Sequence, residues 1–413
     1  MLPVAAAVSR SSLRRWALTA LAAATLGLSA CGGGDRAVEY KPTAMLVFGD
    51  EHSAITEFQV ADSSQVITGM TWSIDSVFET DARVCLPSAE CTSDSDIQSG
   101  AQFFELSEPQ WRFVPTGDDD LPRSYWLIRD GKQSASAADT PTLQRRSLVT
   151  FGTLPPYGCT NNNWVQRVAA SFGLGFRDQT GCANDGTGAV NHAQPGRTVE
   201  QVMADLTAYR GQMRKGVLVT VMVGQRDILE QYQLVMAASE GGRSAALSSS
   251  VSLLAQRGDR LARAIKSVTD TGAQVILVKT PNLSRSPFAS QDGQDSSVLN
   301  DLSVAFNRAL YINPEISRLG RAIAGVDTDE VTLSNTSTSG YTNGVAACDP
   351  KKLFDPDTGS LVVDLDDMPR VCTNISLGVT DASGYVWATP RHLGPGAHSY
   401  IGSVAFNRAA DQF

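Results

Sequence analysis

The sequence predicts an α/β fold in which a parallel sheet is covered by helices on both faces, giving three layers. One pattern in the sequence predicts it. Short, nearly continuous apolar runs alternate with longer stretches of helical spacing through the second half of the chain. Such runs are typical of buried strands, and strands that alternate with helices form parallel βαβ units with right-handed crossovers. The chain has 413 residues, which is ample for a large core and favours one domain with an insertion.

The first predicted strand is the apolar run 45–48, and the rest of the fold is organised around it. The run ends at Gly49 and Asp50, a pair that breaks a strand and permits a sharp turn. Open α/β sheets place their chemistry at the carboxyl ends of their strands. Glu51, His52 and Ser53 therefore stand where a functional site is expected.

The segment 54–157 has a different character. Thr, Ser, Val and aromatic residues alternate in it, as at 65–74, and turn-rich joints such as 116–120 separate the alternating runs. Alternation of this kind predicts strands that are buried on one face only. We therefore expect a mostly β insertion in an α/β domain that spans 44–413.

Beyond Cys159 the α/β pattern is regular. Thr198 begins a predicted helix, because Gln201 follows it at the spacing of a capping box. Residues 335–384 are rich in loops, and the last segment, 385–409, ends in a helix. The remaining predicted helices lie at 164–172, 243–270 and 298–310, and the remaining predicted strands at 217–223, 274–278 and 322–326.

The N-terminus carries an export signal. Arginines precede an apolar run, 16–28, that is too short to span a bilayer as a mature helix. The sequence Leu-Ser-Ala-Cys that follows resembles a bacterial lipobox, which implies a signal peptide over 1–30 and lipidation of Cys31. Residues 31–43 then form a flexible tether. By resemblance to the sorting rules of bacterial lipoproteins, the glycine after Cys31 favours transfer of the protein to the outer membrane. The alternative to a lipobox is an ordinary secretory signal that happens to be followed by a cysteine.

Charge and cysteine content narrow the function further. The net charge of −9 argues against nucleic acid as a partner, because phosphate binding needs a basic face.

Six cysteines follow Cys31, and an even number in an exported protein indicates disulfides, with fifteen pairings formally open. Zinc is the weaker alternative, because no Cys-x-x-Cys cluster is present. Proximity in the sequence suggests the pairs Cys85–Cys91, Cys159–Cys182 and Cys348–Cys372.

Several of these stretches together resemble the conserved blocks of the SGNH/GDSL hydrolases. The strand that ends in Phe-Gly-Asp, the segment from Asn191 to Gly196, the strand and turn at 217–227 and a histidine before the last helix are similar to the family's four blocks in order and spacing. The resemblance covers about 44–53 and 158–413, and the insertion lies outside it. It is supported by the similar stretches 159–166, 275–288, 306–307, 341–348 and 387–396.

The resemblance implies ester hydrolysis, but three of the five positions that would perform it have changed. The family's serine nucleophile corresponds to Glu51, its oxyanion asparagine to Arg226, and its orienting aspartate to Thr389. The oxyanion glycine is retained as Gly196 and the base as His392. A carboxylate at the nucleophile position opposes the charge of an oxyanion, and a threonine cannot stabilise an imidazolium as an aspartate does.

Because the serine and the asparagine face one small site in that family, Glu51 and Arg226 are expected to form a charge-assisted pair. Ser53 is either a displaced nucleophile or, as favoured here, a structural residue that helps a helix to start. His52 is interpreted as a solvated or packing residue beside the site, and Asp50 as an acceptor for turn N–H groups. A retaining-glycosidase pair built on Glu51 has no other support in the chain. Asp227 is expected to cap the helix that follows it, and His192 and His398 to be structural.

Three functions therefore stand side by side. The first is a family-like envelope lipoprotein that has lost most or all catalysis and binds an ester, glycan or lipid-like ligand. The second is an active ester hydrolase that uses Ser53, or Glu51 with His392. The third is an envelope scaffold whose insertion contacts other proteins. No cofactor and no metal are expected, and the membrane anchor at Cys31 is the one partner that the sequence specifies.

Overall fold

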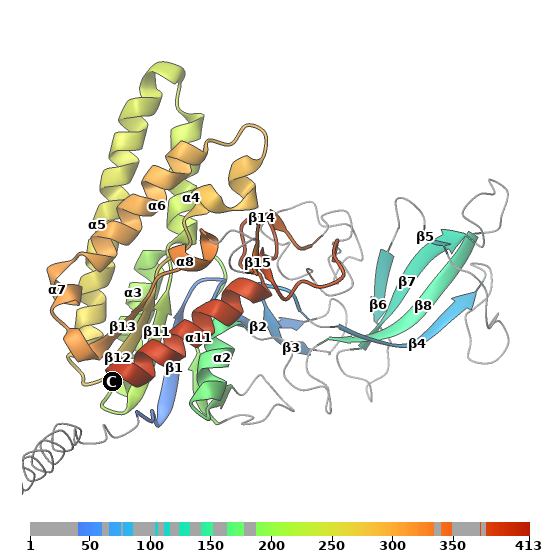
Figure 1. Cartoon of the computed structure of the whole chain (residues 1–413), viewed down its shortest axis with the longest axis horizontal. Helices are drawn as coiled ribbons and strands as arrows, with labels where there is room; N and C mark the ends of the chain where they lie inside the picture. The colour runs from blue at the N-terminus through green and yellow to red at the C-terminus, as the bar shows by residue number, and fades with distance from the viewer. Residues whose placement is uncertain are drawn as a thin grey trace, which may run out of the picture. The chain divides into compact units, whose positions relative to one another are not determined.

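The computed structural model (Figure 1) describes residues 40–59, 66–75, 77–85, 104–105, 111–115, 124–132, 142–151, 163–176, 187–333, 340–348, 372 and 377–413. The chain divides into two units, Met1–Lys41 and Pro42–Phe413, and the elements below belong to the second. The predicted signal peptide and Cys31 lie outside the described residues. None of the helices in the described part combines the length and apolar character that crossing a bilayer requires.

A six-stranded parallel sheet forms the centre of the fold. Strand β1 is flanked by β10 on one side and β11 on the other, so that its carboxyl end lies in the middle of the sheet edge. The predicted strands at 217–223, 274–278 and 322–326 are present, and β9 and β10 are short strands that the apolar runs did not predict. In spatial order the strands are β13 (Ile323–Val326), β12 (Gln274–Val278), β11 (Val217–Met222), β1 (Ala44–Gly49), β10 (Gly188–Asn191) and β9 (Gly175–Phe176).

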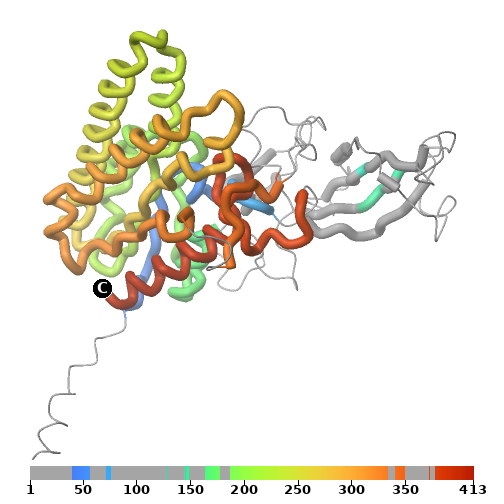
Figure 2. The backbone as a smooth tube through the Cα atoms, turned by 45° about the horizontal axis from the view of Figure 1, so that its top comes forward, coloured from blue at the N-terminus to red at the C-terminus, as the bar shows by residue number. Residues whose placement is uncertain are grey.

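Helices cover both faces of this sheet, which makes the predicted three layers (Figure 1). One face packs against α3 (Val199–Ala208), α4 (Gln225–Ala237), α5 (Arg243–Thr269) and α6 (Ser296–Tyr311). The other is covered by α2 (Trp164–Ser171) and by the C-terminal helix α11 (Pro395–Gln412), which contacts α2 and β13 (Figure 2). The protein is therefore an α/β sandwich.

The sequence explains both the layers and the helix starts. Leu46 and Phe48 of β1 belong to the core shared with α3–α6, while Met45 and Val47 are equally buried and alternate onto the opposite face. Thr198 caps α3 and forms the predicted capping box with Gln201. Shorter helical turns are α7 (Pro314–Ser317), α8 (Asp329–Thr332), η1 (Arg210–Gln212), η2 (Glu240–Gly242), η3 (Leu283–Arg285), η4 (Pro287–Ser290) and η5 (Gly320–Ala322).

Between β1 and α2 the described strands are all antiparallel, in the segment where the sequence predicts a β-rich insertion. One hairpin pairs β2 (Ile55–Gln59) with β3 (Val66–Thr71). A second sheet contains β4 (Val77–Cys85), β5 (Phe104–Glu105), β6 (Trp111–Pro115), β7 (Ser124–Lys132) and β8 (Thr142–Phe151). Near the C-terminus, β14 (Thr342–Ala346) pairs with β15 (Tyr385–Trp387).

Candidate functional site

The carboxyl ends of three neighbouring strands converge on one point. Glu51 follows β1, Gly196 follows β10, and Gln225 follows β11. Strand order places β1 between the other two. The connection after β1 runs toward β9 and β10, whereas the connection after β10 crosses to β11 on the opposite side, which makes this edge a topological switch point, where open α/β sheets bind ligands. The fold thus delivers these three residues to one site although they are far apart in the sequence.

The turn after β1 is held rigidly by Asp50. Its carboxylate accepts hydrogen bonds from the backbone N–H groups of His52 at 3.3 Å and Gly224 at 3.2 Å, as expected of a structural aspartate. Burial raises the pKa of Asp50 well above its usual value, and the charge of Glu51 adds to this effect. A Cβ atom at Gly49 would lie 2.3 Å from the carbonyl oxygen of Met222, so only glycine fits at the end of this strand.

Glu51, which the sequence resemblance puts at a nucleophile position, is bound by two neutral donors. The N–H of Gly196 donates to its Oε2 at 3.0 Å, and the side-chain amide of Gln225 donates to its Oε1 at 2.6 Å. The residue is only 6% exposed. An oxyanion site of the kind the resemblance implies needs a backbone glycine N–H and a side-chain amide as donors. Here the protein's own carboxylate occupies both.

The expected ion pair between Glu51 and Arg226 is wrong. Arg226 donates to Glu230 at 3.0 Å, one helical turn along α4, and its side chain is about half exposed. Gln225, which is 1% exposed, takes the amide role instead. Sequence reasoning passed over Gln225 because it precedes the matching position by one residue. The sequence did contain a signal for this role, because Gln225 is a side-chain amide directly before Arg226, the position at which the family has its asparagine.

His52 is the next member of the same network, and it is buried, so the solvated interpretation is wrong. Its Nε2 lies 2.8 Å from Oε1 of Gln225. Since the Gln225 amide nitrogen donates to Glu51, its oxygen must accept, which assigns the proton to Nε2 of His52. Burial lowers the pKa of His52, so the ring is neutral. The three side chains form a directed chain of hydrogen bonds that ends on the carboxylate.

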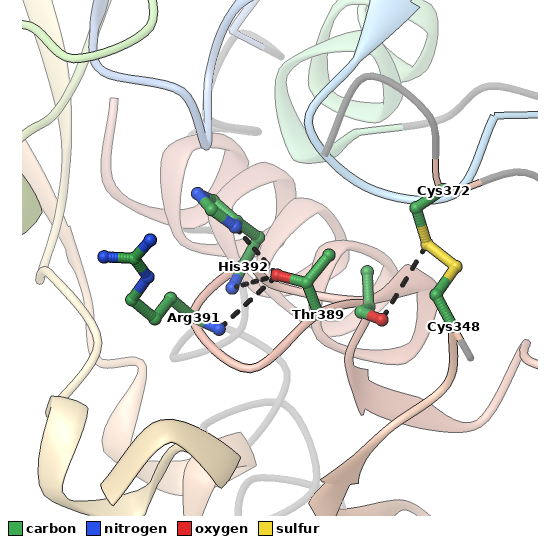
Figure 3. Close-up of a disulfide and its surroundings, with 6 residues drawn as sticks. Cys348, Cys372, Thr389, Arg391 and His392 are labelled. Atoms are coloured by element: carbon green, nitrogen blue, oxygen red, sulfur yellow. Dashed lines mark hydrogen bonds between the residues drawn. A yellow bond between two sulfur atoms is a disulfide. The ribbon is translucent and has the colours of Figure 1, made fainter. Parts of the chain in front are cut away.

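His392, which the sequence resemblance puts at a base position, is oriented by Thr389 (Figure 3). The Thr389 hydroxyl oxygen lies 2.8 Å from Nδ1 of His392 and also accepts the backbone N–H groups of His392 at 3.2 Å and Arg391 at 3.4 Å. Because this oxygen already accepts from two backbone N–H groups, we assign its own proton to the hydrogen bond with Nδ1. The ring then carries its own proton on Nε2. In a catalytic triad the carboxylate accepts Nδ1–H and leaves Nε2 basic, so the tautomer here is the reverse.

Burial also lowers the pKa of His392 well below its usual value, and the neighbouring imidazole of His52 and guanidinium of Arg391 act in the same direction. The ring is therefore a neutral donor at physiological pH. It lies 5.9 Å from the ring of His52 and 5.8 Å from the ring of Trp72, measured between centroids.

The loop that carries His392 is fastened by a disulfide. Cys348 and Cys372 are joined, as their proximity in the sequence suggests, and both contact the carbonyl oxygen of Ala388 (Figure 3). The other two suggested pairs each involve cysteines outside the described residues. The carbonyl oxygen of Cys372 in turn accepts the N–H of Asp75 at 2.9 Å. The disulfide thus connects the histidine loop to the turn at 71–75.

That turn supplies Trp72, which sequence reasoning missed because it lies in the insertion. The Asp75 carboxylate holds the turn by accepting from the N–H and the hydroxyl of Thr71. Trp72 then lines a cavity of about 250 Å³ together with Glu51, Gln225, Arg391 and His392. Gly196 and Arg226 also contribute to its walls. The candidate site is therefore an accessible cavity with a buried carboxylate on one wall.

Ser53 does not lie on this cavity. It is fully buried, its Oγ has no hydrogen-bond partner, and its carbonyl oxygen accepts from the Asn191 amide. The residues after it begin the strand β2, so the expected helix start is also wrong. A hydroxyl with no contact to His392 and no access to the cavity cannot serve as the nucleophile in this geometry.

Three residues predicted to be structural have structural contacts. His192 stacks on the rings of Phe48 and Tyr209, and His398 accepts the first N–H of α2 at Trp164. Asp227 accepts the N–H of Val199, so it caps α3 rather than its own helix α4 as expected. Burial raises the pKa of Asp227 to about 6, although it pairs with Arg257 at 2.7 Å.

No family model matches the sequence, and no curated protein does. Solved structures with a similar fold include an extracellular lipase from Streptomyces rimosus, at 15% identity and a TM-score of 0.32 over 55% of this chain and 81% of that one. A phospholipase A1 from Streptomyces albidoflavus matches at 14% identity and 0.32, over 54% and 80%. An acetylxylan esterase from Geobacillus stearothermophilus matches at 13% and 0.30, over 62% and 88%. Similarity this low carries no argument about the reaction.

Proposed function

We propose that this protein has the architecture of an SGNH/GDSL ester hydrolase and uses the site at the end of β1 to bind a ligand without hydrolysing esters. The observation that carries the proposal is the Glu51 carboxylate, which accepts the N–H of Gly196 and the amide of Gln225. Those donors are the ones an acyl-transfer site would reserve for its oxyanion. The negative charge of Glu51 at this position would repel the negative charge of an oxyanion.

The base position supports the same conclusion. The hydroxyl of Thr389 donates to His392, so the lone pair needed to accept a proton from a nucleophile is absent from the Nε2 atom. Ser53, the alternative nucleophile, is buried away from the cavity. A cavity is nevertheless present at this position, and it is lined by polar side chains whose orientation is fixed by hydrogen bonds. This combination is typical of a binding site.

The test is hydrolysis of p-nitrophenyl acetate and butyrate by the purified protein and three variants, Glu51→Ala, His392→Ala and His192→Ala. His192 lies outside the cavity, so the last variant is a matched control for the loss of a histidine. We expect the same rate for all four proteins, because any residual turnover would come from surface groups. Hydrolysis that disappears in His392→Ala and persists in His192→Ala would contradict the proposal.

We further propose that the protein is an envelope lipoprotein anchored through Cys31. The supporting observation is the basic and apolar N-terminal sequence that ends in Leu-Ser-Ala-Cys. Expression in a Gram-negative host with a radiolabelled fatty acid tests this: the label should enter the wild-type protein and not Cys31→Ser. Equal labelling of the two proteins would show that Cys31 is not the lipidated residue.

A further inference from the structure

Among the described residues, Glu51 has no counter-charge in direct contact with its carboxylate. Both groups that bond its carboxylate are neutral, and within the described residues no lysine or arginine nitrogen lies within 4.0 Å of it. The second carboxylate on the cavity wall, Glu230, is paired with Arg226. A buried charge is costly unless a counter-charge compensates it. A positively charged ligand would therefore stabilise the Glu51 carboxylate more than the Glu230 carboxylate, which already has a partner.

The neighbouring side chains favour an organic cation in particular. Trp72 is partly exposed and lines the same cavity, and the face of an indole ring attracts cations. The histidine rings beside it, His52 and His392, are kept neutral by burial, so they do not repel a positive ligand.

The size and the remaining charges set the limits of the ligand. A volume of about 250 Å³ is at the small end of ligand pockets, which favours a single small molecule over a polymer or a lipid chain. The guanidinium of Arg391, which lies 5.5 Å from the centre of the Phe288 ring, also belongs to the wall. A second positive centre on the ligand would meet that charge. The ligand should therefore carry one ammonium group only.

We infer that the cavity takes a small organic monocation whose ammonium group lies between the Glu51 carboxylate and the Trp72 ring. The inference rests on the proposed ligand-binding function of the same cavity. A ligand that placed an anionic group against Glu51 would be repelled, and a neutral sugar would leave that carboxylate without a counter-charge.

Choline and its uncharged carbon isostere, 3,3-dimethylbutan-1-ol, are the probes, because they differ in charge and hardly in shape. Isothermal titration of the full-length protein should show choline binding at least about tenfold more tightly than the isostere. Glu51→Gln, which keeps the size of the side chain, should weaken choline binding by about tenfold or more. Equal binding of the two probes, or no choline binding at all, would overturn the inference.

Two further variants make the result independent of a folding defect. Trp72→Leu should weaken choline severalfold and leave the isostere nearly unchanged, since only the cation uses the ring quadrupole. Glu240→Gln removes one negative charge from an exposed turn outside the cavity and should bind choline as the wild type does. If Glu240→Gln weakens binding as much as Glu51→Gln, the effect is one of net charge and the inference is wrong.

The ester assay separates this inference from the proposed function. Hydrolysis that depends on His392 would refute the non-catalytic proposal, while tight choline binding by the same protein would still support the cation site. Absence of both hydrolysis and charge-dependent binding would leave the non-catalytic proposal in place and refute the ligand class.

Discussion

Replacing Glu51 by serine and Thr389 by aspartate should create ester hydrolysis, and the two changes should depend on each other. Glu51→Ser frees the N–H of Gly196 and the amide of Gln225 for an oxyanion and supplies a hydroxyl at the cavity wall. Alone it should give only traces of activity, because His392 still receives a proton from Thr389 on Nδ1. The aspartate would accept Nδ1–H instead and make Nε2 basic.

The expected magnitude follows from the reverse change in serine proteases, where replacing the orienting aspartate by asparagine lowers turnover about 10⁴-fold. That factor corresponds to about 5.5 kcal/mol in the activation free energy. The Thr389 oxygen already lies 2.8 Å from Nδ1, so the longer aspartate side chain needs a small shift of its loop. We therefore expect the double variant to exceed Glu51→Ser by about 10² to 10⁴ in kcat/KM for p-nitrophenyl acetate.

Two additions to the double variant test which residue donates to the oxyanion. Gln225→Ala should lower its activity by about 10² to 10³, the loss typical for one donor. Arg226→Asn should change it by less than about threefold, because Arg226 is paired with Glu230 on an exposed face of α4. Full activity of Glu51→Ser without the aspartate would refute the tautomer argument. A requirement for Arg226→Asn would refute the assignment of Gln225.

Three other perturbations have defined outcomes. Gly224→Ala would place a Cβ atom 2.5 Å from a ring carbon of Phe306 at a φ of +141°, so urea unfolding should show a loss of about 2–3 kcal/mol; an unchanged midpoint would contradict the geometry of this turn. Replacing both Cys348 and Cys372 by serine should lower the unfolding free energy by about 2–4 kcal/mol. It should also make tryptophan fluorescence near the cavity more sensitive to quenchers, because the turn at 71–75 would lose its connection to the disulfide. Unchanged quenching would show that the disulfide does not hold this turn. Burial raises the pKa of Asp75 to about 7 from 3.8, so its contribution to stability is fully present below pH 4 and is lost, by up to about 4 kcal/mol, as pH rises to about 7; Asp75→Asn should flatten this part of the stability–pH curve, and an unchanged slope would assign it to other groups.

The sequence by itself determined the elements of the fold and the chemistry of single positions. Apolar runs and helical spacing are local properties, so β11, β12, β13, α5 and the capped start of α3 were predicted close to their observed bounds. The strand β1 with its break at Gly49 located the site, and the three-residue spacing of Thr389 and His392 is short enough for the two to be in contact wherever the loop lies.

Only the tertiary structure decided which side chain contacts Glu51. Gln225 and Arg226 are consecutive residues at the start of α4, and consecutive helical residues point about 100° apart. A shift of one position therefore exchanges the residue that contacts Glu51 for one that contacts solvent and Glu230. The direction depends on how Gly224 turns out of the sheet against Phe306 and Thr280, and that is a long-range packing constraint.

The same reason explains why Trp72 was missed. It lies in a segment without helical periodicity and reaches the cavity because Asp75 bonds to Cys372, which is disulfide-bonded to Cys348 beside the histidine loop. Contacts between residues so distant in the sequence leave no local pattern. The sequence shows the chemistry of each residue. The wall of the cavity to which that residue belongs is set by the packing of the sheet, the first turn of α4 and the disulfide.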